Sequence, residues 1–155
     1  LDAHGVRLEL PVRWSGRLFA RSGAIAVLHA GDYPIALGDG STFGDESTGR
    51  MPAHATFLAL AEYLPGSGLT PGHGLFAAKR IKLPLDPTRF SERALAHPRP
   101  GQQGTQHFFT TAGRPFCLYI VLAGGRSVRR HQLATVDHLL RSLSIAPRSV
   151  GHSRA

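Results

Sequence analysis

The sequence predicts an α+β fold, in which an antiparallel sheet of about six or seven strands is covered on one face by one C-terminal helix, roughly residues 127–143. The predicted strands follow one another through turns and loops rather than helices, an order that favours antiparallel pairing. The last two strands form a hairpin within residues 106–122. After Gly124-Gly125, the spacing of apolar residues changes from two to three and four, which indicates a helix.

Four strands are predicted in the N-terminal half. Apolar residues alternate with charged ones in the first strand, and the third strand is mostly apolar, which is typical of an interior strand. The four segments are Val6–Leu10, Arg17–Ala20, Ala24–Ala30 and His54–Tyr63. A turn at residues 14–16 is expected to join the first two. Residues 31–51 are rich in Gly, Asp, Ser and Thr, and predict a long loop with one helical turn at residues 49–53.

One more strand is predicted before the hairpin. Residues 65–74 are dense in Gly and Pro, which predicts a loop. In residues 75–85, Ile81, Leu83 and Leu85 alternate with Lys82, as expected for a strand with one face in water. Residues 86–103 contain three prolines and are predicted to be irregular.

The hairpin supplies the central strand of the predicted sheet. In residues 116–122, both alternating sets of side chains are apolar, so both faces of the strand should be covered. Ala112-Gly113 provides the turn, because glycine accepts the positive φ that a tight hairpin requires.

The predicted helix has one apolar stripe, which should face the sheet. The stripe consists of Leu133, Val136, Leu140 and Leu143, and Leu139 widens it. Ser127 is the expected N-cap, and Pro147 prevents the helix from continuing beyond Ala146.

The length of 155 residues predicts one domain, residues 1–146, followed by a flexible basic tail, residues 147–155. No apolar run is long enough to span a bilayer. The chain carries a formal charge of +8, from 16 arginines and 2 lysines against 10 acidic residues. The arginines are dispersed, without the basic stripe and interleaved aromatic residues of a nucleic-acid site. We therefore expect an anionic cell-envelope surface or an acidic protein as partner, and not nucleic acid.

The sequence contains no assembled catalytic or metal motif. Its only cysteine, Cys117, excludes an intrachain disulfide and is predicted to be a buried, inert thiol. The nine histidines lack metal-ligand spacing, so neither a metal nor another cofactor is expected. The carboxylates considered for acid–base chemistry are Asp32, Asp39, Asp45, Glu46 and Glu62, but turn chemistry explains acidic residues beside glycine more simply.

One basic cluster is the candidate binding site. Arg126, Arg129, Arg130 and His131 fall on the first turns of the predicted helix, where free N–H groups and the helix dipole already present partial positive charge. A bound anion or an acidic partner surface would offset this unfavourable placement. The alternative is a solvated basic patch that results from the arginine-rich composition.

Several segments resemble a group of uncharacterised extracytoplasmic domains from secreted or membrane-anchored proteins of GC-rich, Gram-positive-type bacteria. The segments are Trp14–Arg17, Gly31–Pro34, Phe108–Tyr119 and Leu139–Ile145. The resemblance implies a cell-surface or secreted location and attachment through a segment upstream of residue 1. It carries no catalytic residue. The end of the helix also resembles that of α+β sandwiches of the PsbP and Mog1 type.

Three functions remain open from the sequence. The first is a non-catalytic extracytoplasmic domain that binds or senses a ligand. The second is a small hydrolase-type enzyme that uses loop carboxylates and histidines. The third is a basic nucleic-acid-binding module, which a steep salt dependence of DNA affinity would reveal.

Overall fold

The computed structural model describes residues 1–23, 25–66 and 68–149. The strands are β1 (Asp2–Ala3), β2 (Val6–Arg7), β3 (Ser15–Arg21), β4 (Ile25–Gly31), β5 (Thr56–Glu62), β6 (Gln102–Thr111), β7 (Arg114–Ala123) and β8 (Ser144–Ile145). The helices are α1 (Asp45–Gly49) and α2 (Arg126–Leu140), with 3₁₀ turns at Gly74–Phe76, Pro87–Arg89 and Glu92–Ala94.

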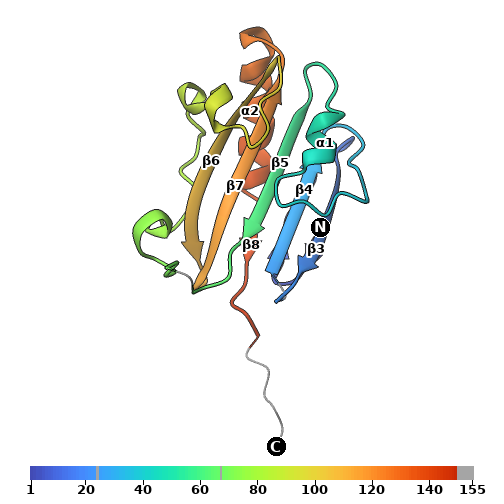
Figure 1. Cartoon of the computed structure of the whole chain (residues 1–155). Helices are drawn as coiled ribbons and strands as arrows, with labels where there is room; N and C mark the ends of the chain where they lie inside the picture. The colour runs from blue at the N-terminus through green and yellow to red at the C-terminus, as the bar shows by residue number, and fades with distance from the viewer. Residues whose placement is uncertain (24, 67, 150–155) are drawn as a thin grey trace, which may run out of the picture.

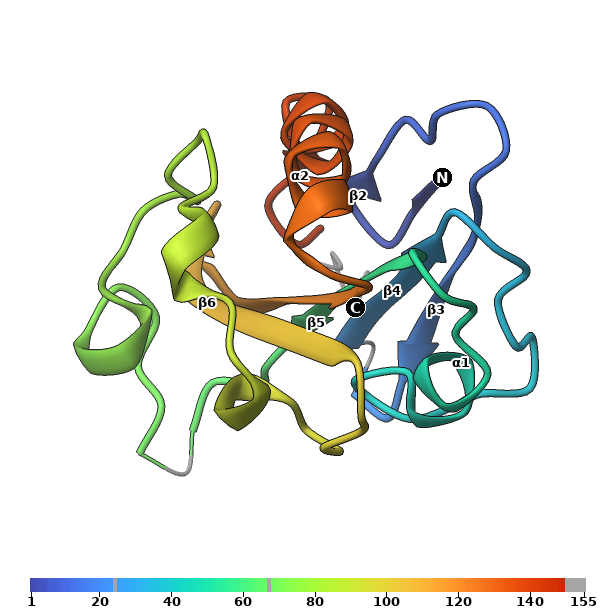
Figure 2. The ribbon, with the colours of Figure 1, turned by 90° about the horizontal axis from the view of Figure 1, so that it is seen from above.

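Five strands form one antiparallel sheet in the order β3-β4-β5-β7-β6 (Figure 1). A second, three-stranded antiparallel sheet has the order β1-β2-β8 and joins the two ends of the chain. In the view from above, α2 and β2 lie on one side of the large sheet, and α1 lies on the other (Figure 2). The predicted α+β class, with an antiparallel sheet and a C-terminal helix over one face, is confirmed.

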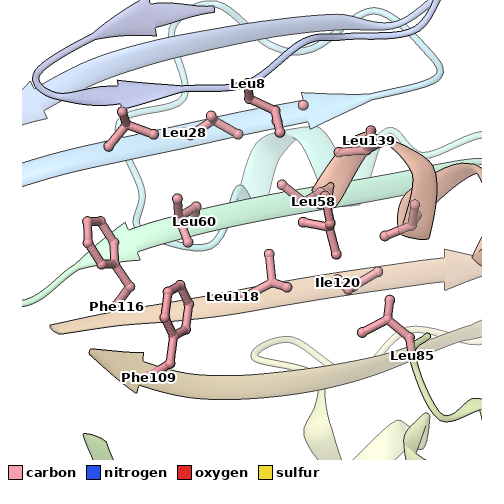
Figure 3. Close-up of a cluster of buried hydrophobic side chains, with 14 of the residues drawn as sticks. Leu8, Leu28, Leu58, Leu60, Leu85, Phe109, Phe116, Leu118, Ile120 and Leu139 are labelled. Atoms are coloured by element: carbon pink, nitrogen blue, oxygen red, sulfur yellow. The ribbon is translucent and has the colours of Figure 1, made fainter. Parts of the chain in front are cut away.

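The main core lies between the large sheet and α2. Leucine and phenylalanine side chains from β4, β5, β6 and β7 meet Leu139 of α2 and Leu8 of the N-terminal segment (Figure 3). Val136 and Leu139 are almost completely buried, as the predicted stripe requires. Burial of this stripe contributes roughly 1.5–3 kcal/mol per large apolar side chain, before the entropy cost of ordering the chain.

The opposite face of the sheet is also covered, here by loops rather than by a long helix. Phe57, Tyr119 and Val121 of the sheet contact Tyr33 and Ile35 from the long loop that carries α1. Every residue of β7 is buried, which confirms the predicted central strand with two covered faces.

Two of the predicted local elements are wrong. The helical turn lies at α1 and not at residues 49–53, because the Asp39 carboxylate accepts the backbone N–H groups of Glu46 and Ser47 and thereby fixes where the turn starts. Residues 75–85 form no strand. Among the described residues of that region, only the carbonyl groups of Phe76 and Ala78, which accept from Thr110, and the N–H of Leu85 are hydrogen-bonded to neighbouring elements. Pro84 lacks an N–H to donate.

Several predicted boundaries also change, and β6 starts at Gln102 rather than at residue 106. The first strand is limited to β2, because β8 offers only two partners for it. The turn before β3 spans Pro11–Trp14. Helix α2 starts one residue earlier than predicted, with Gly125 at the N-cap and no side-chain cap, and ends three residues earlier, so that Ser144 and Ile145 can pair with β2.

A buried ion pair joins the sheet to both ends of the chain. The Glu62 carboxylate is fully buried and accepts two hydrogen bonds from Arg114, each 2.9 Å long, and one from the backbone N–H of Ala26. Arg114 also donates to the carbonyl oxygens of His4 and Ala146. Both terminal segments are therefore held against the same guanidinium group.

The division into a domain, residues 1–146, and a flexible tail, residues 147–155, stays a prediction. Residues 150–155 lie outside the described part. Within the remainder, Arg148 donates hydrogen bonds of 3.1 and 2.8 Å to the Glu62 carboxylate.

We expect Glu62→Gln to lower the free energy of unfolding by about 3–5 kcal/mol, because it leaves the Arg114 charge buried without its partner. Burial by itself raises the pKa of Glu62, but the hydrogen bonds from Arg114 and Ala26 outweigh it and lower the pKa below its ordinary 4.5. A lowered folded-state pKa stabilises the protein above the ordinary value, and this stabilisation disappears as the pH falls through the folded-state pKa.

The difference between wild type and Glu62→Gln should therefore be full near pH 7 and shrink below pH 4.5, as measured by urea unfolding across that range. Glu9→Gln, at an exposed glutamate, serves as the matched control and should change stability by less than about 0.5 kcal/mol. A pH-independent difference would contradict the role given to the Glu62 carboxylate.

Candidate functional site

The four predicted binding residues lie at the N-terminal end of α2, but they do not converge on one point. Arg126 and Arg129 line one hollow, His131 lines another, and Arg130 is exposed on the helix. The first turn of α2 contains no acidic residue, and its N-cap, Gly125, offers no side-chain hydrogen bond. The partial positive charge at this end of the helix is therefore not balanced from within the helix.

The larger of the two hollows has a volume of about 690 Å³ and is open to solvent; we call it the His131 hollow. The α2 side is formed by His131 and Gln132. Arg13 and Trp14, before β3, and His54, before β5, form the facing walls, and Asp32 at the end of β4 completes the site. Its polar groups thus come from four segments that are distant in sequence.

Two turns that each have a positive φ at their third residue line the His131 hollow. In the turn Pro11–Trp14 the third residue is Arg13, with φ 74°, and in the turn Pro52–Ala55 the third residue is His54, with φ 63°. Positive φ at the third position of a turn favours glycine or asparagine. Each of these residues therefore holds a strained backbone at a cost of about 1 kcal/mol or more, a pattern typical of functional sites.

Gln132 fixes the wall that carries His54. Its side-chain amide nitrogen lies 3.1 Å from the carbonyl oxygens of His54 and Ala55 and 2.9 Å from that of Ala123. Gly124 permits the close approach of this wall, because a Cβ there would lie 2.6 Å from Nδ1 of His54. The position of the imidazole is thus set by a buried amide and a neighbouring glycine.

Among the described residues, Asp32 is the only acidic one that lines the His131 hollow. One of its oxygens accepts the backbone N–H of Thr56 at 2.8 Å. Burial raises the pKa of Asp32, although this hydrogen bond and the charge of His131 act in the opposite direction. Within the described residues, no ion pair or hydrogen bond joins Asp32 to His54 or His131.

The second hollow, which we call the Arg126 hollow, has a volume of about 680 Å³. Arg126 and Arg129 line it from α2, and Thr88, Phe90 and Gln103 line it from the other side. Arg129 donates to the side chain of Gln103, which fixes its guanidinium group beside the hollow. The N-terminal end of α2 therefore separates two open hollows, each with basic side chains.

The other carboxylates considered from the sequence do not line the His131 hollow, and two of them, Asp39 and Glu62, have structural roles. The Asp39 carboxylate binds the start of α1 and the Ser41 hydroxyl; burial opposes its ionisation, but these hydrogen bonds lower its pKa below the ordinary value. Glu62 belongs to the buried pair with Arg114.

The predicted state of the cysteine is confirmed. Cys117 is completely buried, and burial raises the pKa of its thiol to about 12, so it is not a nucleophile at neutral pH. Among the described residues, no three His, Cys, Asp or Glu side chains are grouped so that they could hold a metal ion.

Sequence reasoning did not select Arg13, His54 or Gln132. Neither turn carries the glycine or asparagine that would reveal a positive φ, and Gln132 resembles an ordinary polar residue of a helix. The only local indication of these two turns is the proline that begins each of them, Pro11 and Pro52.

No family model matches the chain, and neither a curated protein nor a solved structure matches it. In the described part of the chain, no helix has the length and the apolar character needed to cross a bilayer.

We expect Arg13→Gly and His54→Gly to leave stability unchanged or to raise it by up to about 1 kcal/mol, because glycine relieves the strain of the positive φ. Arg80→Gly is the control at an exposed loop position with ordinary φ, and it should destabilise the fold by about 0.4–1 kcal/mol through the entropy of the unfolded chain. Thermal and urea unfolding measure all three variants. A loss of more than about 1 kcal/mol in Arg13→Gly would show that its side chain serves stability and not the hollow.

Proposed function

We propose that this chain is a non-catalytic extracytoplasmic domain that binds or senses an anionic ligand at the cell envelope, attached through a segment upstream of residue 1. The ligand would be an anionic envelope surface or polymer, or an acidic protein. Its binding face is the N-terminal end of α2 with the His131 and Arg126 hollows on either side.

The distribution of charge at this face is the observation that supports binding. Six basic side chains lie in or between the two hollows, against one carboxylate, that of Asp32: Arg13, His54, Arg126, Arg129, Arg130 and His131. The strained turns at Arg13 and His54 hold basic side chains where glycine is favoured. An anion would be stabilised by the arginines, by hydrogen bonds from the histidines and by the unbalanced end of the helix dipole.

The proposed location rests on the resemblance of Trp14–Arg17, Gly31–Pro34, Phe108–Tyr119 and Leu139–Ile145 to extracytoplasmic domains. A fusion of the complete gene to alkaline phosphatase, which is active only outside the cytoplasm, tests this part separately. An inactive fusion that accumulates normally would contradict the location and leave the binding proposal to its own test.

A hydrolase-type enzyme is the second candidate, because Asp32 and two histidines share the His131 hollow. The raised pKa of Asp32 fits a proton-transferring group, but the missing hydrogen bond to either histidine favours binding over catalysis. Wild type and Asp32→Asn should hydrolyse p-nitrophenyl acetate equally slowly, at the rate of an unrelated histidine-containing protein. A rate well above that level, lost in Asp32→Asn, would favour the enzyme.

We expect Arg129→Glu combined with Arg130→Glu to weaken binding of dextran sulfate, a soluble anionic polymer, by about tenfold at low salt. Arg50→Glu combined with Arg93→Glu makes the same change of net charge at exposed positions remote from α2, and should retain most of the affinity. Fluorescence titration of labelled polymer measures both. Equal losses in the two double variants would show that net charge alone attracts the polymer, and would overturn the proposed face.

A further inference from the structure

A third hollow lies at the opposite end of α2, and its lining is mainly apolar. We call it the Leu140 groove; its volume is about 160 Å³. The apolar lining is formed by Ile81, Leu83, Phe109, Leu140, Leu143 and Ile145. All of these side chains belong to the main core or pack against it, so the groove is an opening into the core between α2, β6 and residues 79–83.

The charged side chains of this groove are all basic. Lys79 and Arg80 line it and are exposed, and no acidic residue in the described part of the chain lines it. The neighbouring sequence is equally biased: residues 63–85 contain both lysines of the chain, Lys79 and Lys82, and no aspartate or glutamate. An apolar groove with a purely cationic edge complements a ligand with an aliphatic chain and an anionic group.

One wall of the groove is free to adjust. This wall consists of residues 79–84 and is fixed at both ends. At one end the carbonyl of Ala78 accepts from Thr110 at 2.8 Å, and at the other end the backbone N–H of Leu85 donates to Asp137 at 2.9 Å. Between these anchors, residues 79–84 make no hydrogen bond with any described residue. Ile81 and Leu83 hold the segment by packing alone, so a chain could enter beneath them without breaking hydrogen bonds.

We propose that the Leu140 groove binds the aliphatic chain of a small anionic amphiphile, with a carboxylate or similar anion beside Lys79 and Arg80. The site is separate from the face proposed above and does not depend on it. A dry cavity of about 150 Å³ admits a ring of six carbons, so the groove should accept about six carbons of the chain. A free medium-chain fatty acid has this chemistry.

Titration of the protein with octanoate in low-salt buffer, followed by amide NMR shifts, tests the proposal. The shifts should concentrate at residues 79–83, 109–111 and 140–145. Each buried methylene strengthens binding about fourfold, so hexanoate, with two more methylenes, should bind about fifteenfold more tightly than butanoate. Dodecanoate should bind little more tightly than octanoate, because its extra carbons stay in water.

Two variants separate the contributions of shape and charge. Lys79→Glu combined with Arg80→Glu should lower the affinity for octanoate at least tenfold and raise the affinity for octylammonium. The remote pair, Arg50→Glu with Arg93→Glu, is the control and should leave octanoate binding unchanged. Leu143→Trp should fill the groove and abolish the binding of both octanoate and octylammonium. The proposal is overturned if octanoate and octylammonium bind wild type equally, if the shifts lie at the His131 hollow, or if the groove responds only to vesicles or to a second copy of the protein.

Discussion

The arrangement of this fold depends on satisfying one buried carboxylate. Glu62 ends a central strand with its side chain fully buried, and an unpaired charge there would cost several kcal/mol. Arg114 can neutralise it only where the β6–β7 hairpin places the guanidinium group beside β5. The same guanidinium binds the carbonyls of His4 and Ala146, so the charge pair also fixes where both ends of the chain lie.

The position of the chain ends determines one wall of the His131 hollow. With His4 and Ala146 held at Arg114, β2 pairs with β8 beside α2, and the segment that follows β2 reaches the turn Pro11–Trp14. That turn is one wall of the His131 hollow. The hollow is therefore bounded by a segment whose start is fixed by a charge pair at the far end of the large sheet.

Features that depend on residues close together in the sequence can be predicted from it. The alternation in β7, the turn at Ala112-Gly113 and the apolar stripe of α2 each follow from local spacing, and the structure agrees with them. Features that depend on contacts with residues farther away in the sequence cannot be predicted in this way. The start of α1 depends on a carboxylate several residues away, and residues 75–85 alternate like a strand but remain without a ladder. The His131 hollow likewise joins four segments that no local pattern connects, and its two strained turns lack the residues that would reveal them.

The charges of α2 are placed unfavourably for the stability of the helix. A helix selected for stability alone carries acidic residues in its first turn and basic residues in its last. Here the first turn contains Arg126 and Arg129 and no acid, and the last turn contains His138 as its only basic residue. An arginine-rich composition explains many basic residues, but it does not explain the absence of acids from the position that favours them most. This unfavourable placement, beside two hollows and two strained turns, therefore supports the proposal that an anion binds at this face.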